Sequence, residues 1–536
     1  MFHSNNYLLS ILVSISEMAS SSGLRQCIRD VSPYLILLVV ISTLGPLQFG
    51  FHLAELNAPQ DVISCRVRQQ PVSRFSAALS LMSSSSPNND QATASSALPD
   101  CVPMDDAQFA VVSSMFTLGG LAGALGSGPI ASAKGRLVAM RLTSLFYIVG
   151  SIIETLGSSI ATLAVGRIFS GVGAGAATVI VPIYISEVAP PRERGTFGAM
   201  TQVSINVGIL VTQTMGYFLS YGSAWRWILG AGILIAAVQG FGLLLIPESP
   251  VWLAANESVA QARRILQRIR GRHYDIGEET STWGDSAVIP EEEGLLNDPS
   301  SGPRKGSTSS KASLKNNGTL GFVEVVKDPL YRPALIAAVG VMCAQQLCGI
   351  NSIIMYSVSL LRDLLPINSA LLTIIISAIN LITTVACSPL PDKFGRKTCL
   401  LLSIFGQGAS ALVLALSILF ETKILSAITV LFFVAFFAVG LGPVPFILAS
   451  ELVGQEAVGA TQSCCLGANY IATFLVAQFF PIINVALNER LGGAGWVYFI
   501  FTALAVLCGL FVLSRVPETK GKRDADEVWG RTQRLD

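Results

Sequence analysis

The chain has 536 residues, of which 51% are hydrophobic and 13% charged, and its formal net charge is +1. Soluble domains carry roughly 25% charged residues, so this composition argues against an ordinary soluble protein and favours a membrane protein. The balanced charge gives no sign of a nucleic-acid partner. We therefore expect the lipid bilayer to be the main surroundings of the chain.

Residues 1–33 are expected to form a cytoplasmic leader ahead of the first membrane helix. The short apolar run 7–15 has no positive charge before it, which is not typical of a signal peptide. A more ordinary polar leader begins at Met18, so the sequence leaves open whether translation starts at Met1 or at Met18.

Twelve apolar segments follow, and a bilayer core of about 30 Å needs about 20 apolar residues per helix. We predict an all-α membrane protein with six helices in an N-terminal half, 34–249, and six in a C-terminal half, 331–516. The expected N-terminal helices are 34–54, 108–131, 138–157, 161–185, 198–221 and 226–246. The expected C-terminal helices are 334–360, 370–390, 399–419, 425–449, 462–485 and 496–515.

A polar linker, 250–330, separates the halves, and a short tail, 517–536, ends the chain. Apolar residues recur at helical spacing over 259–269, which predicts an amphipathic helix, whereas the Ser-, Gly- and Glu-rich stretch 272–318 is expected to be disordered. Lys and Arg gather in the short connections on the linker's side of the membrane. We therefore expect the linker and both termini in the cytoplasm.

The long polar loop 55–107 then lies on the extracellular or luminal side. Cys65 and Cys101 both fall in this loop, and an oxidising compartment would allow them to bridge. The sequence leaves open whether they do. The spacing of the cysteines gives no sign of a metal site.

Matched motifs indicate that one half duplicates the other. Lys134-Gly135-Arg136 is echoed by the segment 392–397, Ser186-Glu187 by Ser450-Glu451, and Pro-Glu-Ser at 247–249 by Pro-Glu-Thr at 517–519. The pairs lie at nearly one spacing, which indicates an internal repeat. A duplicated hydrophobic half is typical of secondary transporters, whose substrate site lies between the repeats.

The repeated charged residues form a candidate cytoplasmic gate. Acids and arginines at helix ends can form bidentate pairs, and pairs present in only one conformation would favour a closed cytoplasmic face. The alternative is ordinary snorkelling and orientation signalling. The candidates are Arg136, Glu187, Arg194, Glu248, Arg396, Glu451 and Glu518.

The run Gly171-Val172-Gly173-Ala174-Gly175 imitates a dinucleotide-binding fingerprint. That motif requires a strand before the glycines, whereas these glycines lie inside an apolar helix. Small residues there let neighbouring helices approach closely. We therefore predict packing and no cofactor, and no motif in the chain supports an enzyme.

Amides inside the predicted helices are the best indication of a substrate. Each amide offers two donors and one acceptor, so several of them without carboxylates suit a neutral polyhydroxy ligand. The alternative is that they bridge helices. Gly349, Pro443 and Pro445 would break helices beside them, as expected near a central site. The amides are Gln202, Gln345, Gln346, Asn351, Asn380 and Asn469.

With these motifs in place, the chain resembles the sugar porter family of the major facilitator superfamily over about 33–522. The matching stretches are QFG at 48–50, NAP at 57–59, GR at 166–167, VPIYISEVAPPRERG at 181–195, QQLCGIN at 345–351, DKFGRK at 392–397, GPVPF at 442–446 and PETKG at 517–521. The resemblance implies the major facilitator fold, with two pseudo-symmetric six-helix halves, and is strongest to fungal members. It also implies sugar-binding roles for Gln202, Gln345, Gln346, Asn351, Tyr356, Asn380, Phe446, Asn469 and Tyr470.

The departures from the family pattern concern the substrate and the gate. Phe446 stands where the family has tryptophan, Ala438 where glucose facilitators have glutamate, and Met355-Tyr356 where they have Tyr-Tyr. These changes put glucose itself in doubt and leave a hexose or polyol plausible. Family arginines are absent from the gate as well, with Leu137, Val251 and Val458 in their places.

The first predicted helix, 34–54, holds the position at which proton-coupled relatives bind the proton. Proton-coupled relatives carry an aspartate just after Phe-Gly-Tyr, paired with the arginine of the GR motif, and here the stretch reads Gly50-Phe51-His52 with Arg167 as the arginine. His52 or Glu55 could carry a proton instead, or both could merely line the extracellular mouth.

We expect a transporter that moves a neutral sugar or polyol by alternating access, by facilitated diffusion and as a functional monomer. The alternatives are a proton-coupled symporter of a sugar or other small solute and a non-transporting sugar receptor. The sequence does not distinguish the plasma membrane from the vacuole or another internal membrane.

Overall fold

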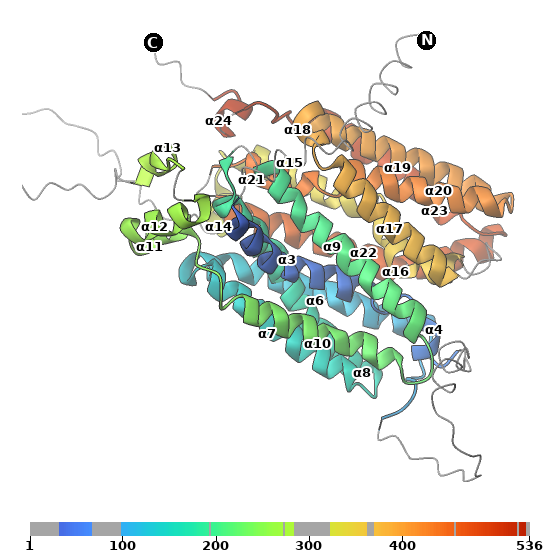
Figure 1. Cartoon of the computed structure of the whole chain (residues 1–536). Coiled ribbons are helices and arrows are strands. Elements are labelled where there is room, and N and C mark those ends of the chain that lie inside the picture. Colours follow the sequence, from blue (N-terminus) through green and yellow to red (C-terminus); the bar gives the residue numbers. More distant parts are fainter. Residues whose placement is uncertain are drawn as a thin grey trace, which may run out of the picture.

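A computed structural model shows a bundle of long helices running in one general direction, and no strand occurs among the residues it describes (Figure 1). The structure describes residues 32–66, 98–191, 194–271, 274–283, 322–361, 369–454, 457–522 and 525–531. Residues 1–31 of the predicted leader, with Met1 and Met18, and residues 284–318 of the stretch predicted to be disordered lie outside these ranges. The prediction of disorder is wrong for the part that is described, because Gly277–Thr280 and Ser281–Trp283 form two short helices.

Each predicted N-terminal helix has a counterpart in the structure. The first three are α3 (Pro33–Ala54), α6 (Asp106–Lys134) and α7 (Arg136–Thr155). The next three are α8 (Ile160–Val188), α9 (Arg194–Leu219) and α10 (Trp225–Gly242). Side-chain caps on Ser32, Asp105 and Ser159 satisfy free N–H groups where three of these helices begin.

The C-terminal half has six spans as well, two of them broken. The first is α15 (Arg332–Leu347) with α16 (Ile350–Leu361), followed by α17 (Ser369–Cys387) and α19 (Arg396–Leu419). The remaining three are α20 (Lys423–Val439) with α21 (Val444–Glu451), α22 (Val458–Leu491) and α23 (Val497–Arg515).

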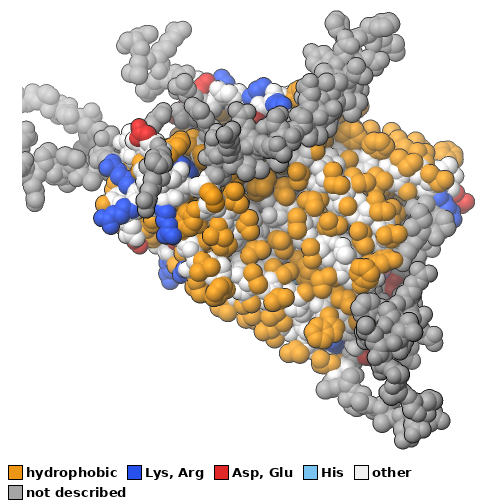
Figure 2. All heavy atoms as spheres, viewed as in Figure 1, with side chains coloured by type: hydrophobic (Ala, Val, Ile, Leu, Met, Phe, Trp, Pro, Cys, Tyr) orange, Lys and Arg blue, Asp and Glu red, His pale blue; other side chains and the backbone are white. Residues whose placement is uncertain are grey.

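The bundle is built to lie in a bilayer. Within the described ranges, ten helical spans are long and apolar enough to cross a membrane, and the bent pair α15 and α16 adds an eleventh. The twelfth, α9, falls short because Gln202, Asn206 and Gln213 lower its hydropathy. Apolar side chains cover the flank of the bundle, while charged residues gather toward its ends (Figure 2). The chain is a multi-pass membrane protein.

The two halves meet along two helix pairs, α6 with α22 and α9 with α17. Glycine allows the first pair to approach closely. A Cβ on Gly120 of α6 would overlap the ring of Tyr470 of α22, and one on Gly128 would lie 2.5 Å from the hydroxyl of Ser463. The small residues therefore allow tight packing of α6 against α22 across the halves.

Short elements mark the two ends of the bundle (Figure 1). One end carries α11 (Pro250–Asn256), α12 (Val259–Arg270), α13 (Gly277–Thr280), α14 (Phe322–Lys327) and α24 (Ala525–Val528), and we call it the linker face. The predicted amphipathic helix is α12, which buries Ala262, Leu266 and Ile269.

The opposite end carries α4 (Gln60–Ile63), and we call it the loop face. Cys65 and Cys101 form a disulfide here, with their Cα atoms 5.4 Å apart. The bridge joins the segment after α4 to the segment before α6, which settles the alternative that the sequence left open.

The glycine run in α8 serves packing, as predicted. A Cβ on Gly171 would overlap the carbonyl oxygen of Phe116, and one on Gly175 would overlap that of Gly120, both in α6. A Cβ on Gly173 would lie 3.1 Å from the ring of Tyr147 in α7. The run therefore brings three helices together.

Candidate functional site

The break between α15 and α16 gathers three amides at the centre of the C-terminal half. The two helices meet at a 43° bend, and Gly349 between them has a φ of 94°, a left-handed conformation that favours glycine. Gln345 and Gln346 lie in the last turn before the bend, and Asn351 lies in the first turn after it.

The break between α20 and α21 supplies acceptors to the same place. Nε2 of Gln345 donates to the carbonyl oxygen of Leu441 at 2.6 Å and more distantly to that of Gly442 at 3.3 Å. Pro443 and Pro445 at the start of α21 have no N–H to donate there. The broken helix thus leaves carbonyl groups free to fix the side chain of Gln345.

The amides bond to one another in a connected cluster. Nε2 of Gln346 donates to Oε1 of Gln345 at 3.1 Å and to Oδ1 of Asn469 at 3.2 Å. Nδ2 of Asn351 donates to Oε1 of Gln346 at 2.6 Å, and Nδ2 of Asn469 donates to Oε1 of Gln345 at 2.8 Å. Three helices of one half therefore share a single hydrogen-bonded unit.

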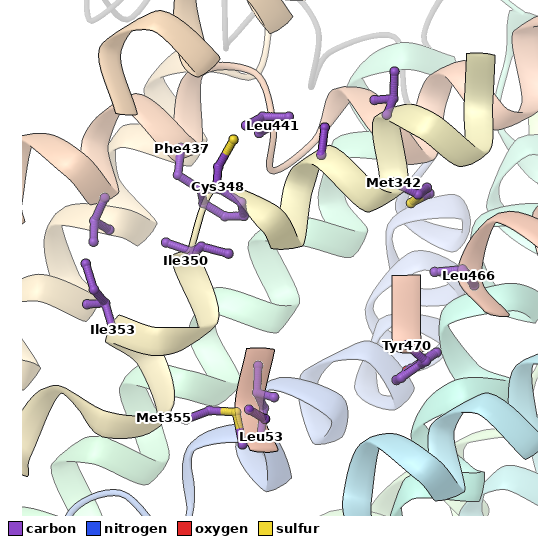
Figure 3. Packing of buried hydrophobic residues seen from close by; sticks show 14 of the residues in the cluster. Leu53, Met342, Cys348, Ile350, Ile353, Met355, Phe437, Leu441, Leu466 and Tyr470 are labelled. Carbon is purple, nitrogen blue, oxygen red and sulfur yellow. The ribbon is translucent and has the colours of Figure 1, made fainter. Parts of the chain in front are cut away.

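These amides surround a small cavity of about 40 Å³ between the halves. Apolar side chains from α3, α16, α20 and α22 close around it, namely Leu53, Ile350, Phe437, Leu466 and Tyr470 (Figure 3). No charged residue lines it among the described residues. Seven of the nine predicted sugar-binding residues line it: Gln202, Gln345, Gln346, Asn351, Phe446, Asn469 and Tyr470.

Tyr356 and Asn380 lie outside the lining of this cavity. The Tyr356 hydroxyl donates to the carbonyl oxygen of Ala477 at 2.7 Å, and its ring stacks on Phe480. Asn380 of α17 instead donates to Oδ1 of Asn206 at 3.3 Å. Asn206 itself was not predicted, although an amide one turn after Gln202 in the same apolar segment was a signal that could have found it.

Aromatic and hydroxyl groups complete the site, and these too were missed. Phe49 of α3 lines the cavity and contacts Tyr470 edge-on, with ring centroids 6.1 Å apart. Thr178 of α8 also lines it, and its hydroxyl lies 3.2 Å from that of Tyr470. Both halves therefore contribute to one site.

A second, larger cavity of about 640 Å³ lies between the halves toward the linker face. Ser186 of α8 and Gly198 of α9 line it from the N-terminal half, and Ser450 and Gln462 line it from the C-terminal half. Phe446 lines both cavities, so its ring lies between the central site and the larger space.

Toward the loop face the halves are in contact. Nδ2 of Asn57 donates to the carbonyl oxygen of Ile354 at 2.9 Å, which joins the end of α3 to α16. Phe49 and Ile354 pack against Ala54, Ile205 and Ile209 nearby. Among the described residues, the halves are therefore in contact between the centre and the loop face and are separated by the larger cavity toward the linker face.

The predicted gate residues form two copies of one arrangement, one in each half. In the N-terminal half, Nη2 of Arg136 binds Oε1 of Glu187 at 2.8 Å, and Glu248 accepts from the backbone N–H groups of Arg136 and Leu137. Burial raises the pKa of Glu248 above its usual value, and these N–H groups and Arg136 offset only part of that rise.

In the C-terminal half, Nη2 of Arg396 binds Oε1 of Glu451 at 2.8 Å, and Glu518 accepts from the backbone N–H groups of Arg396 and Lys397. Each of these described pairs joins helix ends of the same half. They brace each half at the linker face. Arg194 begins α9, but its side chain lies outside what the structure describes.

The predicted coupling residues form a buried cluster inside the N-terminal half. Nδ1 of His52 lies 2.9 Å from Oε2 of Glu55, and Nη1 of Arg167 lies 2.5 Å from Oε1 of the same carboxyl group. The side chains of His52, Glu55 and Arg167 are at most 1% exposed, so they do not line an open mouth.

Glu154 of α7, which was not predicted, is a fourth member of this cluster. Its Oε1 accepts from the Ser170 hydroxyl at 2.7 Å, and its other oxygen has no partner among the described residues. An acid within an apolar segment is a signal that could have found it. Ligand atoms of His52, Glu55 and Glu154 lie within 4.8 Å of one another, but Arg167 already binds Glu55 and its charge opposes a metal cation.

Comparison with protein families decides where this architecture belongs. Residues 37–526 match the family model described as sugar (and other) transporter. The chain belongs to this family of transporters. The match covers both halves and the linker, so the sugar (and other) transporter family accounts for nearly the whole chain.

Two relatives and a solved structure agree with the sugar (and other) transporter assignment. A probable metabolite transport protein of Saccharomyces cerevisiae is 33% identical, with 97% of this chain and 99% of the relative covered. The mouse facilitated glucose transporter member 3 is 29% identical, with 92% of each chain covered. The fold matches that of the major facilitator proton:xylose symporter XylE with a TM-score of 0.69 at 21% identity, covering 93% and 98% of the two chains.

Proposed function

We propose that this chain moves a neutral sugar or sugar-like polyol across the membrane by alternating access, as facilitated diffusion. The observation that carries the proposal is the lining of the central cavity, where amides and aromatic rings from both halves meet without a charged group. Sugars offer hydroxyl groups to amides and apolar ring faces to aromatic side chains. A carboxylate or ammonium substrate would need an opposite charge in this place.

The closed centre supports a mechanism in which the halves separate to admit the substrate. A cavity of about 40 Å³ holds about one water molecule, far less than a sugar. The amides of Gln345, Gln346 and Asn469 now bond to one another. A sugar would take over these hydrogen bonds, so little bonding is lost when the cluster opens around it.

The difference between the loop face and the linker face supports alternating access. The contact of Asn57 with Ile354 closes the route to the loop face, while the cavity of about 640 Å³ leads toward the linker face. Rocking the halves about the central site would open a route to the loop face and close the cavity toward the linker face. In this conformation Phe446 lines both the central cavity and the larger one, so we expect it to move when the two join.

Proton symport is the second candidate, favoured by the buried cluster of His52, Glu55, Glu154 and Arg167. Two carboxyl groups and one arginine cannot be neutral together unless one proton is also bound. Ionisable residues inside a membrane protein often mark proton pathways. Release of that proton in one conformation only would couple it to the sugar.

The orientation that we propose places the linker face in the cytoplasm. Lys134, Arg136, Lys393 and Arg396 lie at this end, in agreement with the usual excess of positive charge on the cytoplasmic side. The disulfide between Cys65 and Cys101 at the loop face suits an oxidising compartment. The membrane would be the plasma membrane or an internal one such as the vacuole, with the monomer as the working unit.

Uptake of labelled hexoses and myo-inositol into proteoliposomes, with and without an inward proton gradient, tests the proposal. We expect saturable uptake that equilibrates without accumulating and does not respond to the gradient. Gln346→Ala should raise KM about tenfold or more, because it removes an amide at the centre of the cluster.

Gln407→Ala is the matched control, since Gln407 is a buried amide of α19 away from the cavity and its side chain has no partner among the described residues. It should leave KM unchanged. Accumulation driven by the gradient would replace facilitated diffusion with symport. Binding of a sugar without any uptake would instead support a receptor.

A further inference from the structure

Asn206 on α9 joins two predicted sugar-binding amides that come from different halves. Its Oδ1 accepts from Nε2 of Gln202 at 3.1 Å and from Nδ2 of Asn380 at 3.3 Å. Its Nδ2 donates to the hydroxyl of Thr384 on α17 at 2.7 Å. Asn206 is 1% exposed and does not line the central cavity.

These bonds determine which way the two neighbouring amides face. An amide group carries its nitrogen and its oxygen on opposite sides of one carbon, so an amide that turns its nitrogen to Asn206 turns its oxygen away. Gln202 lines the central cavity. Oδ1 of Asn380 is buried and has no partner among the described residues.

The amides of the C-terminal half present a different pattern. Oε1 of Gln345 already accepts from Gln346 and Asn469, and Oε1 of Gln346 accepts from Asn351. Their oxygens are therefore occupied. On the side governed by Asn206, Oδ1 of Asn380 is an acceptor that no described residue occupies.

We propose that Asn206 is a positioning residue that turns the oxygen of Gln202 toward the cavity and leaves the oxygen of Asn380, behind it, without a partner among the described residues, so that the substrate must donate a hydroxyl hydrogen to this side of the site. The inference rests on the proposed function and adds to it a rule for substrate choice. Thr384 holds Asn206 in this orientation from the opposite half. The group recognised is a hydroxyl acting as a donor, a role that neither an ether nor a fluorine can fill.

Fluorinated sugars separate a required donor from a required acceptor. Replacing a hydroxyl by fluorine keeps a weak acceptor of similar size but removes the hydrogen, whereas a deoxy sugar lacks both. A buried acceptor left without its donor weakens binding by roughly tenfold or more. At the hydroxyl that faces Gln202, the fluoro and deoxy analogues should therefore be equally poor.

The experiment uses the full-length protein in proteoliposomes and the sugar found to be transported. KM and maximal rate are measured for this sugar and for its monofluoro and monodeoxy analogues at each hydroxyl. In the natural protein we expect one position at which both analogues raise KM about tenfold or more. Fluorosugars that match the parent at every position would overturn the proposal.

Asn206→Leu, which keeps the size of the side chain and removes its hydrogen bonds, tests the residue itself. We expect the KM of the parent sugar to rise and the maximal rate to change much less. The KM of the fluorosugar divided by the KM of the parent sugar should fall toward one. A merely structural role would lower the rate and leave that ratio unchanged, which would overturn the assignment.

Gln213→Leu provides the matched control, because Gln213 is an equally buried amide on the same helix with no side-chain partner among the described residues. It should preserve the fluorosugar ratio. If Asn206→Leu does not fold, Thr384→Val removes only the anchor of Asn206 and should reduce the ratio in part; an unchanged ratio there counts against the proposal. A natural protein that transports no sugar would contradict the proposed function instead.

Discussion

At the scale of single residues, burial makes Arg167 the most consequential cation in the N-terminal half. Its guanidinium binds Glu55 and the carbonyl oxygen of His52, and it lies 4.6 Å from the ring centroid of Phe116. Glu154 belongs to the same cluster. Charges removed from water need a partner, and here the one arginine binds Glu55, which lies close to the second acid, Glu154.

We predict that Arg167→Leu destabilises the protein by about 3 kcal/mol, because it leaves buried carboxyl groups without their cation. Thermal unfolding in detergent, followed for the purified full-length protein, measures the change. Arg141→Leu is the control, since Arg141 is exposed and its side chain donates to the carbonyl oxygen of Leu243, a neutral acceptor, and should cost less than about 1 kcal/mol.

A double variant checks the cause. Arg167→Leu combined with Glu55→Leu removes the ion pair as a whole, and apolar replacement of a buried pair is often neutral or stabilising. Most of the lost stability should return. If the double variant is as unstable as Arg167→Leu alone, packing of the long side chain is responsible rather than its charge.

At the scale of helices, the positions of the spans follow from the sequence because each must be about 20 apolar residues long. All twelve predicted segments overlap a helical span of the structure. Their ends were less predictable. Helix α22 continues to Leu491 through the polar residues Asn488 to Arg490, since a helix can extend beyond the apolar core of the bilayer.

Five of the cavity residues could be expected from the sequence alone, because amides in apolar segments are costly without a purpose, whereas Phe446 and Tyr470 were expected from the family resemblance. The sequence could not show which amides bond to each other. Asn206 and Glu154 escaped notice since they match no motif, and their roles depend on contacts with helices distant in sequence. Tyr356 was assigned by resemblance, yet its hydroxyl bonds to Ala477.

The broken span α15–α16 should be sensitive at Gly349. An alanine there would have a left-handed backbone, and its Cβ would lie 2.9 Å from the ring of Phe501. We predict a loss of about 2 kcal/mol for Gly349→Ala, measured by thermal unfolding, together with weaker sugar binding as the amides shift.

Gly126→Ala is the matched control, because a Cβ at this exposed helical position meets nothing within 4 Å. It should be neutral or slightly stabilising. Equal loss in the two variants would show that the bend at Gly349 is not the sensitive feature.

At the scale of the whole molecule, one sequence must be stable in at least two arrangements of its halves if it transports. The ion pairs of the described gate residues lie within each half, so each half can move as a unit without breaking them. What differs between arrangements is the set of contacts across the halves. Sequence patterns identify the halves but not which set of contacts is formed.

The contact of Asn57 with Ile354 belongs to this changing set, and it offers a test of alternating access. With cysteines at both positions, Asn57→Cys and Ile354→Cys, an oxidant should join α16 to the end of α3 and hold the loop face closed. We predict that uptake in proteoliposomes stops on cross-linking and returns on reduction, because the halves can no longer separate on that side.

Each single-cysteine variant, treated in the same way, accounts for effects of the reagents on the native disulfide and on the free native cysteines, of which Cys343 and Cys464 are partly exposed. Sugar binding from the linker face should survive the cross-link, since the larger cavity and Phe446 lie on the other side of the contact. Loss of both binding and uptake would mean that the cross-link distorts the central site. Uptake that continues at full rate in a fully cross-linked sample would show that the sugar does not pass between α3 and α16, and would contradict movement of the two halves about the central amides.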